Sequence, residues 1–167
     1  DYLPLHQVVV PTFAGTDIHF QHLATHSAGL PMNLSGNYPL PPGTPYDDPF
    51  ALMTADRVFD YLTHYAMLEF QPGTAYQYSN FGYGLLGYIL ARNTGSSYEA
   101  VLKKVVLDEL GMVHTRIHLT DHDRQNLATG YDKDGMETAL FATGNVLVGA
   151  GHLKSNLQDL MVYLRAN

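Results

Sequence analysis

Hydrophobic residues recur at helical spacing in five stretches of the chain, and this periodicity predicts five helices. Capping residues, glycines and prolines set the expected ends of each helix. Thr54 is the expected N-cap of the second helix. Pairs of Ser96 with Glu99 and of Ser155 with Gln158 predict capping boxes for the last two helices. The helices are expected at residues 18–26, 55–65 and 79–92, from Ser96 to Gly111, and from Ser155 through Leu164.

Each predicted helix carries apolar side chains at helical spacing; those of the helix at 55–65 form a stripe, in which Ala66 can replace Tyr65, and those of the helix at 79–92 are expected to face inward. These side chains are Ile18, Phe20, Leu23 and Ala24; Phe59, Leu62 and Tyr65; Leu86, Ile89 and Leu90; Val101, Leu102, Val105 and Val106; and Leu157, Leu160, Met161 and Leu164.

The segments between the helices predict loops and a few short strands. Six of the nine prolines lie between Pro31 and Pro49, which predicts a long irregular loop. Residues 113–119 alternate weakly between apolar and polar, and the sequence DKDG at 132–135 predicts a hairpin turn. The fold class is therefore expected to be mainly α with a few short strands, in one domain over residues 1–167.

Composition excludes several classes of protein. With 46% hydrophobic residues in a chain of 167, a packed core is expected and intrinsic disorder is excluded. The net charge of −7 without a basic run argues against nucleic-acid binding. The chain has no cysteine, so disulfides, thiolate zinc sites and a cysteine nucleophile are excluded. No apolar run approaches the ~20 residues of a membrane-spanning helix, and residues 1–4 have no signal-peptide character.

Two motifs suggest ligands but have simpler explanations. Residues 82–87 match GxGxxG, yet a polar segment precedes them and no βαβ pattern follows, so close helix packing explains the glycines better than a dinucleotide. His22 and His26 share a helical spacing of four, as do His118 and His122, but the sequence has no HExxH and neither pair has an evident third ligand. We therefore expect neither a cofactor nor a bound metal, and keep a histidine-based metal protein as a minor alternative.

Nucleophile motifs are missing from these residues. The sequence contains no GxSxG, no Ser-x-x-Lys and no Lys-Thr-Gly. The tripeptide Tyr78-Ser79-Asn80 follows a Pro72-Gly73 turn at a helix start, and alone it would be explained by packing and capping.

Several stretches together resemble the class C-like branch of the serine β-lactamase and penicillin-binding-protein superfamily, which includes D,D-peptidases and esterases. Residues 18–31 (IHFQHLATHSAGLP) resemble the family segment ITLRHLLTHTSGLP. Residues 72–87 resemble its Pro-Gly, Tyr-x-Asn and following helix. Residues 94–98, 110–115 and 151–160 continue in register, and Tyr2-Leu3-Pro4 fits the tripeptide that usually precedes this block. The resemblance covers nearly the whole chain.

This resemblance implies the helical subdomain of an α/β serine hydrolase that acts on β-lactams, D-alanyl peptides or esters. It implies that the Tyr78 phenol transfers protons and that Asn80 helps to hold the substrate. Acyl transfer needs a base near the nucleophilic hydroxyl and an acid for the leaving group, and an amide can orient both a lysine and a substrate. Tyr-Ser-Asn occurs across the family's peptidases and esterases, whereas Tyr-Ala-Asn is common among dedicated class C β-lactamases.

The family's Ser-x-x-Lys and Lys-Thr-Gly elements would lie outside residues 1–167, so we expect the chain to be the central part of a longer protein and inactive alone. The alternative is a non-catalytic helical binding module. We expect a small-molecule or peptide substrate, no nucleic-acid partner, and self-association through apolar faces that lack their sheet. The resemblance suggests a periplasmic or secreted location, although nothing in these residues indicates export.

Overall fold

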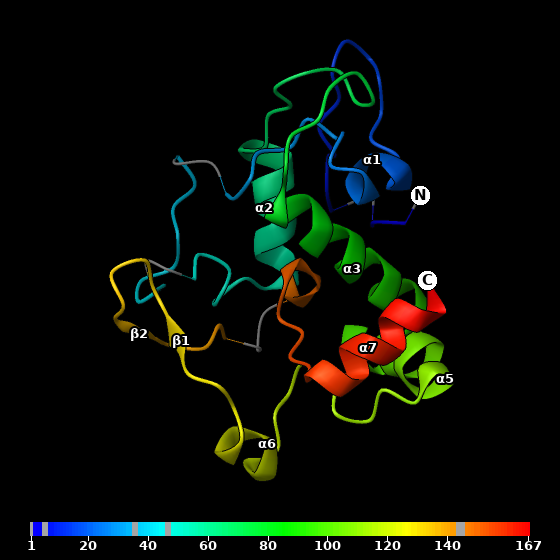
Figure 1. Cartoon of the computed structure of the whole chain (residues 1–167). Helices are drawn as coiled ribbons and strands as arrows, with labels where there is room; N and C mark the ends of the chain where they lie inside the picture. Colours follow the sequence, from blue (N-terminus) through cyan, green and yellow to red (C-terminus); the bar gives the residue numbers. More distant parts are fainter. Residues whose placement is uncertain (1, 5–6, 35–36, 46–47, 143–145) are drawn as a thin grey trace.

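The computed structural model describes residues 2–4, 7–34, 37–45, 48–142 and 146–167, and these are mainly helical (Figure 1). One two-stranded antiparallel sheet, β1–β2, accompanies the helices in the described part of the chain. The elements are α1 (Phe20–Ala24), α2 (Ala55–His64), α3 (Asn80–Thr94), α4 (Tyr98–Leu102), a π-helical turn (Lys103–Leu107), α5 (Asp108–Leu110), α6 (Asp121–Gln125), β1 (Gly130–Tyr131), β2 (Glu137–Thr138), the 3₁₀ turn η2 (Val148–Ala150) and α7 (Leu157–Ala166).

Helices α2 and α3 form the centre of the core. The Tyr61 ring of α2 meets the Phe81 ring of α3 edge-on, with centroids 4.8 Å apart, and both side chains are fully buried. Phe81, Leu85 and Ile89 follow one another at intervals of four residues and form the buried stripe of α3. The prediction that Leu90 faces inward is wrong: its side chain is 46% exposed, because it lies one position beyond this stripe.

The first two helices begin near their predicted positions. Thr54 caps α2 as predicted, and its hydroxyl accepts a hydrogen bond from the Arg57 N–H. Helix α1 is shorter than the predicted 18–26, because His19 is its N-cap and His26 has a left-handed backbone with φ of 55°. The described part of 31–49 contains turns and no helix or strand, as predicted for this loop.

The glycines of the GxGxxG sequence let α3 approach its neighbours closely. A Cβ on Gly84 would lie 2.8 Å from the Cβ of Leu147, and one on Gly87 would lie 3.2 Å from the Cα of Gly149. A side chain at either position would push α3 away from the segment that contains η2. The packing explanation for these glycines therefore agrees with the structure.

Both predicted capping boxes are wrong by one residue. Ser97 caps α4 by accepting from the Ala100 N–H, while the Glu99 carboxylate turns away to bind other backbone groups. Asn156 caps α7 by accepting from the Asp159 N–H. The hydroxyl of Ser155 is instead 2.7 Å from that of Thr115.

The apolar stripe predicted after Ser96 is only partly buried. The π-helical turn rotates the chain between α4 and α5, so that Leu107 is buried while Val105 is 64% exposed. Gly111 ends α5 in a left-handed conformation with φ of 69°, as its position predicted. Residues 113–119 form one bridge, between Arg116 and Lys154, rather than a strand. The β1–β2 hairpin pairs Tyr131 with Glu137 around the predicted turn.

Asp159 fastens α7 to the loop that follows α5. Its buried carboxylate accepts from the His114 N–H at 2.9 Å and from the Thr115 hydroxyl at 2.7 Å.

Asp159→Asn weakens the acceptor and places an unpartnered N–H₂ in this pocket, so we expect a loss of about 1.5 kcal/mol in the free energy of unfolding. Urea denaturation measures the effect, and an unchanged midpoint would contradict this assignment. Asp134→Asn, in the exposed hairpin, is the matched control.

Helix α7 leaves its apolar side chains in solvent, because Asp159 is the buried residue of this helix. The exposed large hydrophobic residues of α7 are Leu157, Leu160, Met161, Tyr163 and Leu164. Exposed apolar surface favours association. Self-association of the chain therefore stays a prediction, and we expect α7 to form the contact between copies of the chain. Light scattering between about 1 and 100 μM measures it; Leu160→Glu with Leu164→Glu should reduce any association. A chain that stays monomeric over this range contradicts the expectation.

Within the described ranges, no helix has the length and apolar character needed to cross a membrane.

Candidate functional site

Tyr78 lies in an extended segment directly before α3, and the side chain of the next residue anchors that segment. The Ser79 hydroxyl donates to the carbonyl of Pro31 at 2.7 Å and accepts from the Gly82 N–H at 2.8 Å. One buried hydroxyl therefore caps α3 and ties its start to the loop after α1. The position of Tyr78 is set by these contacts on its neighbour.

The Tyr78 side chain is accessible. It is 46% exposed, and no described group hydrogen-bonds to its phenolic oxygen. One face of the ring packs on His26, with ring centroids 4.5 Å apart. The phenol is thus held by its ring while its hydroxyl remains free to meet another molecule.

Asn80, the first residue of α3, lies beside this tyrosine in the sequence but uses its amide on a different loop. Its Nδ2 donates to Oδ1 of Asn33 at 3.1 Å, and the side chain is partly buried. The neighbouring Phe81 N–H donates to the Met32 carbonyl at 3.2 Å. The loop at residues 31–33 therefore lies against the start of α3 and orients the Asn80 amide.

A second loop closes the same region from the other side. Gly29 accepts from the Glu69 N–H at 2.9 Å, and Ser27 accepts from the Gly73 N–H at 2.8 Å. Gly73 lies against the ring of His22, since a Cβ there would be 3.2 Å from Nε2. The predicted Pro72-Gly73 turn is thus joined to α1 and to the residues after it, and the chain continues from this turn into the Tyr78 segment.

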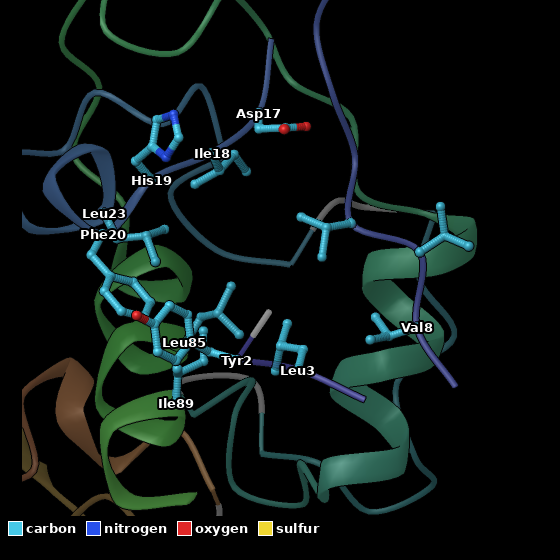
Figure 2. A pocket seen from close by; sticks show the side chains of 12 residues that line it. Tyr2, Leu3, Val8, Asp17, Ile18, His19, Phe20, Leu23, Leu85 and Ile89 are labelled. Carbon is cyan, nitrogen blue, oxygen red and sulfur yellow. The ribbon is translucent and has the colours of Figure 1, made fainter. Parts of the chain in front are cut away.

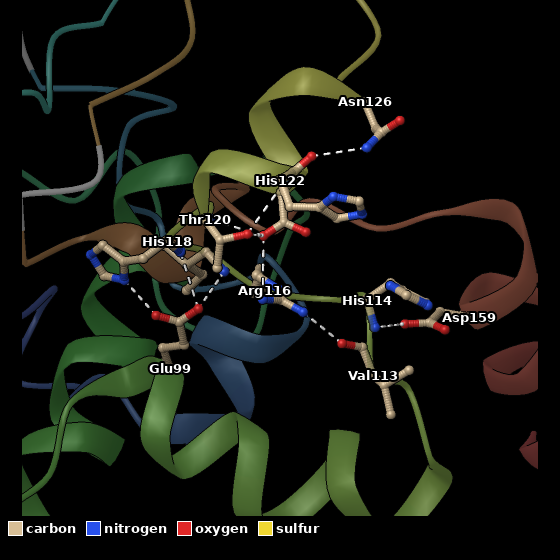
Figure 3. A network of polar contacts seen from close by, with 11 residues as sticks. Glu99, Val113, His114, Arg116, His118, Thr120, His122, Asn126 and Asp159 are labelled. Atoms are coloured by element: carbon tan, nitrogen blue, oxygen red, sulfur yellow. Dashed lines mark hydrogen bonds and ion pairs between the residues drawn. The ribbon is translucent and has the colours of Figure 1, made fainter.

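A separate polar network lies at the far end of α3 (Figure 3). The Glu99 carboxylate binds the His118 ring and accepts from the Ile117 N–H at 2.6 Å. Burial by itself raises the pKa of Glu99, but these hydrogen bonds outweigh it and hold the pKa below its usual value. Arg116 forms an ion pair with Asp123 at 3.2 Å. Sequence reasoning missed this network, because it assigned Glu99 to a helix cap.

The histidine pairs do not assemble into a metal site. Nδ1 of His22 accepts from the His19 N–H, and Nδ1 of His26 accepts from the Ser79 N–H, so both serve the backbone. In the part of the chain that the structure describes, no group of three or more histidine, aspartate and glutamate side chains is arranged to hold a metal ion.

A cavity of about 760 Å³ lies between α1, α3 and the N-terminal segment (Figure 2). It is lined mainly by apolar side chains, including Phe20, Leu23, Leu85 and Ile89. Tyr78 and Asn80 are not among the lining residues, so this cavity is distinct from the site around the phenol.

Three buried or half-buried histidines make stability sensitive to acid. Burial lowers the pKa of His22, His26 and His152. The pKa of a histidine in the unfolded chain is about 6.5. As the pH falls through this value, the unfolded chain binds more protons than the folded chain, so the unfolding free energy should decrease as the pH decreases. Urea midpoints at pH 7.5, 6.5 and 5.5 measure this loss, and a constant midpoint would refute it. His152→Gln should make the loss smaller, because the amide does not titrate.

Comparisons with known proteins show the family of this chain. The family described as Beta-lactamase matches residues 1–167. The chain belongs to the β-lactamase family. It is 29% identical to a β-lactamase of Providencia stuartii over 90% of this chain and 35% of that protein. It is 33% identical to the D-alanyl-D-alanine-carboxypeptidase/endopeptidase AmpH of Escherichia coli (strain K12), over 64% of this chain and 26% of that protein.

Solved structures of this family share the fold. The crystal structure of a β-lactamase/D-alanine carboxypeptidase from Yersinia pestis, complexed with citrate, superposes with a TM-score of 0.71 at 28% identity. The match covers 94% of this chain and 42% of that one. The chain spans about a third of the length of the first curated relatives it matches. The superfamily resemblance and the mainly helical fold class predicted from the sequence are therefore confirmed.

Proposed function

We propose that this chain supplies Tyr78 and Asn80 to the active site of a serine acyl hydrolase. Its substrates would be β-lactams, D-alanyl peptides or esters, cleaved through an acyl-serine intermediate. The observation that carries the proposal is the placement of Tyr78: its side chain is 46% exposed, no described group hydrogen-bonds to its hydroxyl, and its ring packs on His26 in an anchored segment at the start of α3.

In the proposed reaction, the serine hydroxyl attacks the substrate carbonyl and gives its proton to the side-chain oxygen of Tyr78, which acts as the base. When the tetrahedral intermediate collapses, its C–N or C–O bond breaks and the Tyr78 phenol gives the proton to the departing nitrogen or oxygen, which becomes an amine or an alcohol; in a β-lactam this amine stays attached to the acyl group. Water then attacks the acyl-serine ester and gives a proton to the Tyr78 oxygen. That proton passes to the serine oxygen as the ester bond breaks, which releases the acid and restores the serine hydroxyl. Asn80 takes part through its amide, whose carbonyl and N–H₂ can orient a lysine and a substrate amide together.

We further propose that residues 1–167 are a helical subdomain whose nucleophile and ammonium groups come from other parts of a longer polypeptide. These residues contain no Ser-x-x-Lys and no Lys-Thr-Gly. Without a serine activated by a nearby base there is no covalent step, so the 167-residue chain alone should not hydrolyse these substrates. The exposed apolar side chains of α7 are consistent with a face that packs on such additional structure.

The test compares the 167-residue chain with the polypeptide encoded by the complete reading frame. A fluorescent penicillin should label the longer polypeptide covalently, and mass spectrometry should place the adduct on a serine of a Ser-x-x-Lys sequence. Labelling of the 167-residue chain itself would overturn the division of residues. A reading frame without Ser-x-x-Lys, together with no labelling, would favour the non-catalytic binding module.

A further inference from the structure

One residue, His26, binds the backbone on both sides of Tyr78. The His26 carbonyl accepts from the Gln77 N–H at 2.8 Å, and its ring Nδ1 accepts from the Ser79 N–H at 3.0 Å. In an extended segment, alternate N–H groups point to the same side, so one residue can satisfy both. His26 thus fixes the backbone of residues 77–79, on both sides of Tyr78.

The ring of the same histidine also fixes the tyrosine side chain. The His26 ring lies 4.5 Å from the Tyr78 ring and 4.7 Å from the Tyr83 ring, centroid to centroid. Tyr83 is itself held, because its hydroxyl donates to the Ala24 carbonyl at 3.1 Å. His26 therefore connects Tyr78 to the body of α3 through two ring contacts.

The backbone of His26 adopts an unusual conformation in this arrangement. Its φ of 55° is in the left-handed region, where asparagine, aspartate and histidine are the most frequent residues after glycine. Such a conformation persists only where surrounding contacts maintain it. Here it turns both the carbonyl and the ring of one residue toward the Tyr78 segment.

We propose that His26 is a positioning residue for the Tyr78 phenol, acting through two backbone hydrogen bonds and one ring contact. The inference rests on the proposed function for its effect on turnover, but the positioning itself is a property of this chain. It assigns a role to a histidine whose spacing from His22 suggested only a metal pair.

The geometry requires a particular form of the imidazole. An Nδ1 atom that accepts from a peptide N–H carries no proton, so the neutral ring is protonated at Nε2. Burial lowers the pKa of His26 and so favours this neutral form. The titratable side chains packed against the ring are Tyr76, Tyr78 and Tyr83, and no described carboxylate, lysine or arginine forms an ion pair or hydrogen bond with it.

The first test uses the unsubstituted 167-residue chain and needs no activity. Nitrogen-15 NMR at pH 7.5 should show His26 as the Nε2–H tautomer, because a protonated and an unprotonated ring nitrogen have very different shifts. On acidification, the amide shift of Ser79 should change with the same midpoint as the His26 ring. An Nδ1–H tautomer, or a Ser79 amide that ignores the ring titration, would overturn the proposal.

The second test separates the hydrogen bond from the ring contact, and it uses the unmodified polypeptide encoded by the complete reading frame. His26→Phe keeps an aromatic ring but removes the acceptor, and kcat should fall about 10- to 100-fold with KM changed less than about twofold. His26→Asn tolerates the left-handed backbone and keeps an acceptor oxygen, so it should recover most of this loss. Equal kcat in His26→Phe and in the unsubstituted enzyme would refute the positioning role.

The two proposals fail in different ways. If Tyr78→Phe leaves turnover unchanged, the proposed function fails, while the tautomer and the Ser79 titration still report on His26. If Tyr78→Phe abolishes turnover and His26→Phe does not affect it, the proposed function stands and the positioning role is wrong.

Discussion

Tyr78→Phe should lower kcat of the longer polypeptide about 100- to 10,000-fold, which is the usual contribution of a positioned acid or base. The substitution removes the phenolic oxygen and keeps the ring that contacts His26. No described group hydrogen-bonds to that oxygen, so the fold should lose nothing that urea denaturation would detect. Single-turnover acylation and steady-state hydrolysis of one chromogenic substrate measure the effect.

Tyr76→Phe is the matched control for this experiment. Tyr76 is two residues away and 69% exposed, so removal of its hydroxyl should leave kcat within about twofold. A loss of the same size in both variants would point to a general disturbance of the segment rather than to proton transfer by Tyr78. Unchanged acylation in Tyr78→Phe would exclude the proposed catalytic role.

Gly29→Ala should destabilise the 167-residue chain by about 2–5 kcal/mol. The backbone at Gly29 has φ of 77°, which costs an alanine about 1–2 kcal/mol. The new Cβ would also lie 2.5 Å from the carbonyl oxygen of Phe70, and relief of such a contact requires movement of the backbone, at about 1–3 kcal/mol more. The displaced loop continues to Gly73 and then to the Tyr78 segment, so local order there should fall as well. Urea denaturation and the Ser79 amide shift measure both effects.

Gly95→Ala separates the two causes. Gly95 also has a left-handed backbone, with φ of 66°, but a Cβ there meets no atom within 4 Å. It should therefore lose only the conformational part, about 1–2 kcal/mol. If both variants lose the same free energy, the close approach of Gly29 to Phe70 is not what requires a glycine at this position.

Helix positions and the family could be predicted from local patterns. The cap at Thr54 and the end at Gly111 depend on bonds within one turn of chain, so nearby residues suffice to predict them. Leu90 was predicted to face inward because apolar residues surround it in sequence, while only the tertiary packing around α3 selects the stripe of Phe81, Leu85 and Ile89.

The caps at Ser97 and Asn156 show why neighbouring residues were not enough elsewhere. Glu99 fits a capping box by sequence, yet its carboxylate gains more hydrogen bonds from Ile117 and His118, which are distant along the chain. Ser155 likewise pairs with Thr115. Where a side chain has a local and a distant partner, the sequence contains both choices and only the packed structure selects one.

Tyr78 and Asn80 could be proposed from the order of motifs along the chain, and their catalytic roles stay predictions. The sequence by itself determined the family, the helical character and these two candidates, because each depends on residues close together in the chain. The tertiary structure alone decided that His26 binds on both sides of Tyr78, since residues about fifty positions apart meet there. Such contacts arise from the packing of loops against α3, which no local periodicity encodes.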